Sequence, residues 1–230
     1  MIAVVVPAHD EEALLGACLR SLARAAACPR LLGEEVRVIV ALDDCRDRSA
    51  SIAAAHGVQT LSLQARSVGQ ARAAGARVAL AQGARWLSFT DADSTVAPDW
   101  IAAQLAEAAQ CVCGTVEVAD WSPHTPALRA LYESGYSDTP GHRHIHGANL
   151  GVCAQAYARV GGFAPVCAHE DVKLVRMLQD SGARIAWSNR PRVRTSARLA
   201  ARAPEGFSLH LAQLHRQLHR AAPAAAAVAP

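Results

Sequence analysis

Residues 86–94 read WLSFTDADS, an apolar run that ends in two aspartates on either side of one alanine. Three similar runs precede it, over residues 2–6, 36–42 and 58–63, and each is followed by a polar or glycine-bearing turn and an alanine-rich segment. β-Branched runs that alternate with helical segments are typical of βαβ units, in which the strands pair in parallel. The first half of the chain therefore predicts four parallel strands, the last over residues 86–90.

The first helix is expected immediately after the first strand. Apolar residues recur at helical spacing from Leu14 to Leu22, and the acidic stretch Asp10-Glu11-Glu12 precedes them. Acidic residues stabilise the N-terminus of a helix because they interact favourably with its dipole. We therefore expect these acids to cap the helix.

The second half of the chain is less regular. It predicts helices over residues 98–110, 172–180 and 207–220 and a strand over residues 112–119. Residues 134–145, SGYSDTPGHRHI, are polar and rich in turn formers, so we expect a loop that covers a site. We expect residues 1–220 to form one domain with two halves, about 1–95 and 96–220, and residues 221–230 to be a disordered tail.

The composition excludes several classes of protein. The chain has 230 residues, of which 51% are hydrophobic, enough for one substantial core. Its 23 basic and 20 acidic residues leave a formal net charge of +3, too small to indicate a nucleic-acid-binding surface. The seven cysteines lack CxxC spacing, which argues against a zinc site or a disulfide framework and favours a reduced, cytoplasmic protein. No apolar stretch approaches the roughly 18 residues of a transmembrane segment.

Asp91 and Asp93 carry the strongest chemical pattern in the sequence. Both follow a predicted strand, and ligands of open α/β sheets bind beyond the carboxyl ends of the strands. Carboxylates two residues apart can both reach one Mg²⁺ or Mn²⁺ ion, which in turn binds substrate phosphates. The alternative is that both side chains only cap the turn that follows the strand.

Polar residues that follow the first two predicted strands should face the same edge of the sheet. Asp43 and Asp44 end the second strand, where a carboxylate can accept a hydrogen bond from a base or a ribose hydroxyl. The alternative for Asp44 is to cap the next helix. His9 and Glu11 follow the first strand and could line the same crevice, although a histidine in such a turn is more often an ordinary turn residue.

Two later segments carry groups suited to phosphate binding and to proton transfer. Gly69 opens a predicted helix and Arg72 lies one turn into it, so helix amides and a guanidinium can meet a phosphate there. Glu170 and Asp171 precede another predicted helix, where a carboxylate can act as a general base. The alternative is that both acids only stabilise the N-terminus of that helix.

The order of these segments resembles that of the family 2 glycosyltransferases, which have the GT-A fold. The resemblance covers about residues 2–190 and rests on the segments VVVPAHDEE, VIVALDDCRDRS, VGQARAAGA, FTDADS, HGANLGV, GGF and HED. It implies an α/β fold with a Rossmann-like mixed sheet flanked by helices. The parallel half, about residues 1–95, would bind a nucleotide-diphospho-sugar donor, commonly a UDP sugar, and residues 96–220 would form the acceptor half.

The resemblance also assigns roles to residues. Asp91 and Asp93 match the metal-binding DxD motif, which implies Mg²⁺ or Mn²⁺ as cofactor. Asp171 matches the acid of the ED motif that is proposed as the catalytic base, with Glu170 beside it, and Asp44 matches the acid that contacts the base of the nucleotide. The residues expected to bind the donor are Pro7, Ala8, His9, Glu11, Asp44, Gly69, Arg72, Asp91 and Ala92.

The same resemblance implies transfer to an acceptor hydroxyl with inversion at the sugar. We expect Arg194 and Arg198 to clamp the leaving diphosphate from the acceptor side, on grounds of their charge and position. Three alternatives stay open: a retaining transferase of the same fold, a nucleotidyltransferase, and a catalytically silent module that binds a nucleotide sugar.

The sequence does not identify the acceptor. Three alternating histidines, His142, His144 and His146, are candidates for completing the metal shell or contacting the acceptor. The leucine stripe of the last predicted helix either seals the fold or forms a homodimer contact. No nucleic acid is expected as a partner, and peripheral contact with a membrane surface is left open.

Overall fold

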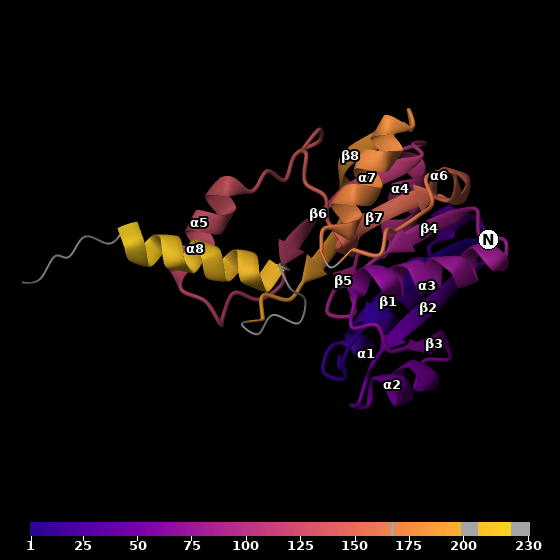
Figure 1. Ribbon diagram of the computed structural model, residues 1–230, viewed down its shortest axis with the longest axis horizontal. Helices are drawn as coiled ribbons and strands as arrows, with labels where there is room; N and C mark the ends of the chain where they lie inside the picture. The colour runs from indigo at the N-terminus through magenta and orange to yellow at the C-terminus, as the bar shows by residue number, and fades with distance from the viewer. Residues whose placement is uncertain (167, 199–206, 222–230) are drawn as a thin grey trace, which may run out of the picture.

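The computed structural model describes residues 1–166, 168–198 and 207–221, and within them one mixed sheet carries helices on both faces (Figure 1). The eight strands of this sheet follow the order β3-β2-β1-β4-β7-β6-β8-β5. The strands are β1 Ile2–Ala8, β2 Val36–Asp43, β3 Gln59–Leu63, β4 Trp86–Phe89, β5 Thr95–Val96, β6 Cys111–Val118, β7 Leu150–Cys153 and β8 Ile185–Thr195. The helices are α1 Leu15–Ala26, α2 Ser49–Ala55, α3 Val68–Ala81, α4 Trp100–Ala106, α5 Pro126–Gly135, α6 Ala154–Arg159, α7 Glu170–Asp180 and α8 Phe207–Ala221, with short 3-10 turns η1 Pro29–Leu31 and η2 Gly147–Asn149.

The parallel part of the sheet confirms the prediction. β2 and β4 both pair with β1 in parallel, and β3 pairs with β2 in parallel. Every residue of β1 is buried, as expected of a central strand covered by helices on both sides. Because parallel strands end at one edge, the turns after β1, β2 and β4 lie together there.

The second half contains elements that the sequence analysis did not predict, among them β7, β8, α5 and α6. β7 is antiparallel to both β4 and β6, and β8 runs parallel to β6 with a register shift between Gly114 and Val116. β8 reads IAWSNRPRVRT, whose arginines and proline obscure the alternation of its buried residues. The helix predicted over residues 98–110 ends at Ala106, because Ala108 takes a left-handed φ of 48° before β6.

The acidic stretch after β1 does not cap α1, contrary to the prediction. The helix begins at Leu15, and its N-cap residue makes no side-chain hydrogen bond. Asp10 and Glu12 instead accept hydrogen bonds from the loop after β2. The Asp10 Oδ1 atom accepts from the Arg46 amide at 2.7 Å, and Glu12 Oε2 accepts from the Arg48 amide at 3.1 Å. These acids therefore join two loops at the edge of the sheet.

Helices cover the sheet from both sides, and two helices form a separate arm. Alternate residues of β1 point to opposite faces, so one set packs with α1 and α4 and the other with α3 and α7. α8 packs on α5 through a smaller cluster that includes Tyr132 and Leu211, which is 1% exposed. Leu211 and Leu214 of the α8 stripe thus pack within an arm that projects from the sheet in Figure 1, and a homodimer contact through this stripe stays a prediction.

Three further expectations concern the chain as a whole. Six described cysteines are free thiols, as expected from their spacing. Within the described ranges, no helix combines the length and the apolar character that a membrane crossing requires. The predicted tail, residues 221–230, lies outside the described residues except for Ala221, which ends α8.

Asn149, in η2, joins elements of the second half through its buried amide. Its Oδ1 atom accepts from the Trp100 indole at 2.8 Å, and its Nδ2 atom donates to the carbonyls of Thr115 at 2.7 Å and Pro191 at 2.9 Å. A Cβ atom at Gly114 would overlap this amide, so glycine is needed beside it. One side chain therefore connects α4, β6 and β8.

We expect the Asn149→Ala variant to lose about 3 kcal/mol of unfolding free energy, because three hydrogen bonds disappear and their buried partners stay unpaired. Urea denaturation measures this loss. Asn189→Ala is the matched control, since that amide donates only one described bond, to the Asp138 carbonyl at 2.9 Å in an exposed position. Equal losses in the two variants would contradict the structural role of Asn149.

Candidate active site

A cavity of about 890 Å³ lies at the carboxyl ends of the parallel strands. Residues that follow β1, β2 and β4 line one side of it, and the N-termini of α3 and α7 line another. α5, the segment before η2 and Leu214 of α8 close the far end. Its volume is within the range of about 300–1,000 Å³ that is usual for small-molecule sites.

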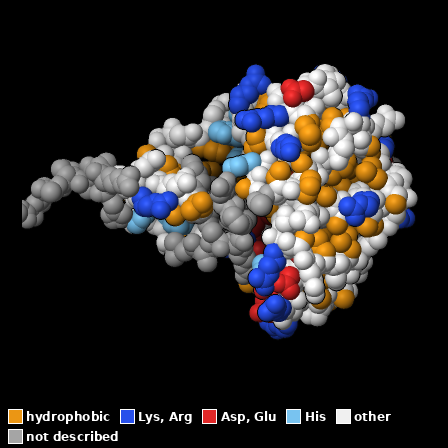
Figure 2. All heavy atoms as spheres, in the orientation of Figure 1, with side chains coloured by type: hydrophobic (Ala, Val, Ile, Leu, Met, Phe, Trp, Pro, Cys, Tyr) orange, Lys and Arg blue, Asp and Glu red, His pale blue; other side chains and the backbone are white. Residues whose placement is uncertain are grey.

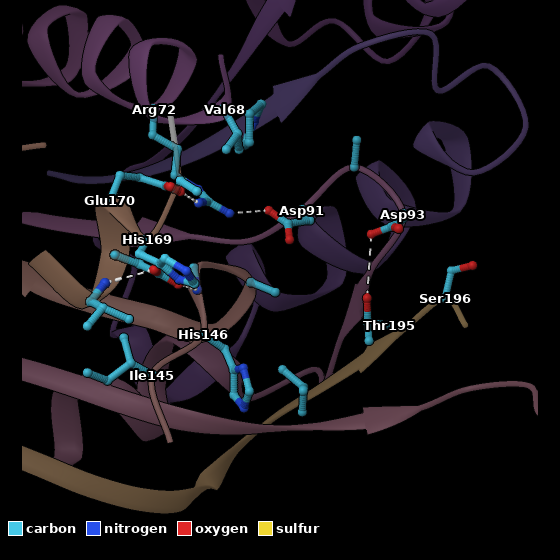
Figure 3. A pocket seen from close by; sticks show the side chains of 18 of the residues that line it. Val68, Arg72, Asp91, Asp93, Ile145, His146, His169, Glu170, Thr195 and Ser196 are labelled. Carbon is cyan, nitrogen blue, oxygen red and sulfur yellow. Dashed lines mark hydrogen bonds and ion pairs between the residues drawn. The ribbon is translucent and has the colours of Figure 1, made fainter. Parts of the chain in front are cut away.

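Arg72 lies at the centre of the charged side of this cavity, although it is only 4% exposed. Figure 3 shows its guanidinium between two carboxylates that come from different parts of the chain. Its Nη2 atom donates to Asp91 at 2.5 Å, and its Nη1 atom donates to Glu170. The bridge joins the end of β4 to the start of α7, so the DxD segment and the ED segment belong to one site.

Asp93 is held by a different set of partners. Its Oδ2 atom pairs with Arg198 at 2.8 Å, and the same guanidinium pairs with Glu11 at 2.9 Å. The hydroxyls of Ser94 and Thr195 donate to its Oδ1 atom at 3.2 and 3.5 Å. Arg198 therefore lines the cavity and bridges two carboxylates there. Arg194, which was predicted with it, does not line the cavity and pairs with Glu117 at 3.1 Å in an exposed position.

The environment of Asp93 disfavours its charge. The pKa of this carboxyl is raised to about 6, mainly by burial and then by the negative charges of Asp91 and Glu11, against the lowering effect of Arg198. The carboxylates of Glu11, Asp91 and Asp93 thus lie close enough to disfavour one another's charge. Such a region is suited to an added cation.

Asp171 points into the cavity from the first turn of α7. Its Oδ2 atom accepts from the Gly147 amide at 2.7 Å, and its Oδ1 atom accepts from the Val172 amide at 2.7 Å. Glu170, its neighbour, is instead buried against Arg72. Arg72 balances the negative charge of Glu170 at ion-pair distance.

Most of the predicted site residues meet in this cavity. Its lining includes Pro7, Ala8, His9, Glu11, Arg72, Asp91, Ala92, Asp93, Glu170, Asp171 and Arg198. Gly69 and Asp44 do not line it. Gly69 lies against Glu170, where an added Cβ would come within 3.1 Å, so it allows α3 to pack closely on α7.

Asp43, rather than Asp44, lines the cavity at the end of β2. Its carboxylate accepts backbone hydrogen bonds from Ala65, Arg66 and Ser67 at 2.7 to 2.9 Å and so fixes the loop before α3. Asp44 has a left-handed φ of 50° and pairs with Arg66 at 2.6 Å. The contact of Asp44 with a nucleotide base stays a prediction.

Several cavity residues were not singled out from the sequence, namely Arg66, Ser67, Tyr132, Tyr136, His169, Thr195 and Ser196. His169 precedes the ED pair and has a left-handed φ of 57°, which is rare for a side chain of this size. Figure 3 shows its ring between the Arg72 cluster and His146. The HED triplet was a usable signal, because a histidine beside a candidate base is suited to the same site.

A second group of potential ligands lies at the rim, in the loops after β1 and β2. Ligand atoms of Asp10, Cys45 and Asp47 lie within 4.8 Å of one another. Asp10 and Asp47 use their oxygens to accept loop amides, including that of Ser49 at 2.9 Å, and the Cys45 thiol donates to a carbonyl of β1. These contacts explain why the three side chains lie close together, because they connect the loop after β1 to the loop after β2.

Comparison with known proteins identifies relatives of the chain. A sequence profile described as Glycosyl transferase family 2 matches residues 3–158. No curated protein matches the chain. Solved structures that resemble it include S. aureus TarS 1–349 in complex with UDP-GlcNAc, with a TM-score of 0.67 and 13% identity over 94% of this chain. That alignment spans 65% of the TarS chain, so this chain is shorter than the protein it resembles.

Two further structures have the same arrangement. Mannosyltransferase PcManGT from Pyrobaculum calidifontis, in complex with GDP-Man and Mn²⁺, has a TM-score of 0.63 and 18% identity over 100% of this chain and 65% of its own. Glucosyl-3-phosphoglycerate synthase from Mycobacterium tuberculosis, in complex with phosphoglyceric acid, has a TM-score of 0.59 and 20% identity over 95% of this chain and 77% of its own. At these identities the likeness establishes the fold, which is GT-A.

We expect replacement of Asp93 by asparagine to alter stability in a pH-dependent way. Since its pKa rises from 3.8 to about 6 on folding, the native state keeps a proton in this interval that the unfolded chain releases. Stability contributed by this group is therefore lost as the pH rises through the interval. When the pH rises from about 4 to about 8 in the presence of a chelator, the unfolding free energy of Asp93→Asn should therefore gain about 2–3 kcal/mol relative to that of the unchanged protein.

Urea denaturation at the two pH values measures this gain. Asp180→Asn is the control, because Asp180 is an exposed carboxylate at the other end of α7 and should show no such gain. A stability difference for Asp93→Asn that is the same at both pH values would contradict the environment described for Asp93.

Proposed function

The chain belongs to glycosyl transferase family 2, and we propose that it transfers a sugar from a nucleotide-diphospho-sugar, probed first as a UDP sugar, to an acceptor hydroxyl. The observation that carries this proposal is the shared cavity of Asp91, Asp93 and Asp171, with Arg72 joining the first and last of these segments. A donor-binding motif and a catalytic base must face the same reacting atoms, and the location of all three carboxylates in one cavity supports these roles.

The donor would lie along the edge of the parallel strands. Pro7 and Ala8 end β1 and His9 follows it, and the His9 ring contacts the Asp43 carbonyl at 2.6 Å, so the ends of β1 and β2 form one wall. This wall suits the nucleoside, because it combines an apolar surface with backbone and carboxylate acceptors. The diphosphate would then reach Asp91 and Asp93, one strand further along the sheet.

The charges of the site fit a divalent cation. Five carboxylates, those of Glu11, Asp91, Asp93, Glu170 and Asp171, line this side of the cavity, and two arginines, Arg72 and Arg198, pair with four of them. These groups together carry a net negative charge, and a diphosphate is also an anion, so a bound cation is needed between them. Asp91 and Asp93 would hold Mg²⁺ or Mn²⁺, which supplies charge neutralisation for the leaving nucleoside diphosphate when bound.

Asp171 is our candidate for the catalytic base. Of the carboxylates in this group, it is the one that no described arginine pairs with, while two backbone amides fix its orientation. An oriented carboxylate that faces the cavity can accept the proton of an acceptor hydroxyl as that oxygen attacks the sugar carbon. Attack from the side opposite the leaving diphosphate would invert the anomeric centre.

We expect Asp171→Asn to lower donor cleavage at least about 100-fold while nucleotide binding is unchanged, because asparagine keeps an oxygen for the Gly147 amide but cannot take a proton. UDP release from UDP sugars measures cleavage, with water as acceptor. Calorimetric titration with UDP and Mn²⁺ measures binding.

Two further variants serve as comparisons, one in the metal site and one on an exposed helix end. Combined replacement Asp91→Asn with Asp93→Asn should abolish metal-dependent nucleotide binding, whereas Asp180→Asn, on the exposed end of α7, should change neither measurement. If Asp171→Asn cleaves the donor at the unchanged rate, Asp171 is not the base. If no nucleotide diphosphate of a UDP and GDP panel binds with either metal, the proposed function is wrong.

A further inference from the structure

The cavity has two ends that differ in chemistry. The charged side chains that line it lie at the ends of β1, β2 and β4, in the loop before α3 and its first turns, at the start of α7 and at Arg198. The far end is formed by α5, by residues 144–146 before η2, and by α8, and its described lining is Leu131, Tyr132, Gly135, Tyr136, His144, Ile145, His146 and Leu214. No Lys, Arg, Asp or Glu occurs in that described part of the lining. Figure 3 shows Ile145 and His146 across the cavity from Arg72.

A stack of rings forms the wall of this far end. Tyr136 stacks on His144 with ring centres 4.3 Å apart and an interplanar angle of 8°. Tyr132 stacks on Tyr136 at 5.3 Å, and His146 lies 5.9 Å from Tyr136. Figure 2 shows histidine side chains beside hydrophobic ones where the arm meets the rest of the molecule. The stack ties α5 to the segment before η2, so this wall is built by contacts between elements.

Two rings of the stack form hydrogen bonds within the protein. The Tyr136 hydroxyl accepts from the Val116 amide at 2.7 Å and forms a hydrogen bond with His146 Nε2 at 3.1 Å. His144 Nε2 accepts from the Ser137 amide at 3.1 Å. These bonds fix the rings, whose carbon faces and edges contribute apolar surface to the cavity.

The pKa shifts of three of these rings favour their uncharged forms. Burial raises the pKa of Tyr136 to about 12 and raises that of Tyr132 as well. Burial lowers the pKa of His144, and the neighbouring His142 lowers it further. This shift favours the neutral form of His144, so its ring is poorly suited to supply a cation for a phosphate or a carboxylate.

Apolar side chains that are only half buried complete this end. Leu131, Ile145 and Leu214 line the cavity while keeping part of their surface accessible, so a ligand that covers them gains hydrophobic free energy. An anionic group placed there would lose its hydration and find no Lys or Arg among the described residues that line this end, which is costly. The far end thus favours an uncharged, apolar occupant.

We propose that the acceptor is an uncharged alcohol or phenol whose apolar body lies against Leu131, Tyr136 and Leu214. This inference rests on the proposed function, since it names the class of molecule that delivers the hydroxyl. Ile145 and His146 lead directly into Gly147, whose amide binds Asp171. A body seated at the far end therefore places its hydroxyl beside the candidate base.

Two alcohols of similar shape test the proposal, para-isopropylbenzyl alcohol and para-(hydroxymethyl)benzoate, which differ by an isopropyl group in place of a carboxylate. Saturation-transfer NMR titrations with the full chain, with and without UDP and Mn²⁺, measure both affinities. We expect the neutral alcohol to bind at least about tenfold more tightly, because the carboxylate lacks a cationic partner. We expect Leu131→Arg to reverse that order by supplying the cation.

Leu32→Arg is the matched control, since Leu32 is 93% exposed and does not line the cavity. It should leave the preference for the neutral alcohol unchanged. The proposal is overturned if the benzoate binds as tightly as the neutral alcohol, if neither alcohol binds, or if Leu131→Arg leaves the ratio of affinities unchanged. UDP binding in the same samples reports on the donor end alone, so its loss would refute the proposed function separately.

Discussion

The arrangement of the site depends on one buried guanidinium. Arg72 leaves the second turn of α3 and pairs with Asp91 after β4 and with Glu170 at the start of α7. A side chain at position 147 would collide with that guanidinium, so only glycine fits there. The amide of Gly147 then donates to Asp171. Removing Arg72 would leave two carboxylates in the site without their cation, which makes the bridge a requirement for the fold as well as for the site.

This bridge also divides the cavity into two environments. On its side lie closely spaced carboxylates, and burial together with their mutual repulsion raises the pKa of Asp93 to about 6 and favours an added cation. On the other side lie stacked rings, in which Tyr136 and His144 form hydrogen bonds within the protein. Asp171 lies between the two environments. The charged donor and the neutral acceptor that we propose would therefore share one cavity and meet at this carboxylate.

The sequence was sufficient for the parallel half of the sheet, because its strands are apolar runs and its acids follow them directly. It was not sufficient for β8, whose buried positions alternate with arginines. The choice between Asp43 and Asp44 depended on a left-handed φ of 50° at Asp44, which no propensity indicates. The partners of Arg72 could not be predicted from the sequence, for a different reason. Glu170 is 98 positions away, so that pairing follows from how α7 packs on α3.

A double-mutant cycle on Arg72 and Glu170 tests this account most directly, with unfolding free energies from urea denaturation at neutral pH. Arg72→Met alone should lower the unfolding free energy by about 3–5 kcal/mol, because it leaves Glu170 as a buried, unpaired charge. Adding Glu170→Gln should recover about half of that cost or more, since no charge is then stranded beside Gly69. Additive losses in the double variant would contradict the bridge as the interaction on which the site depends.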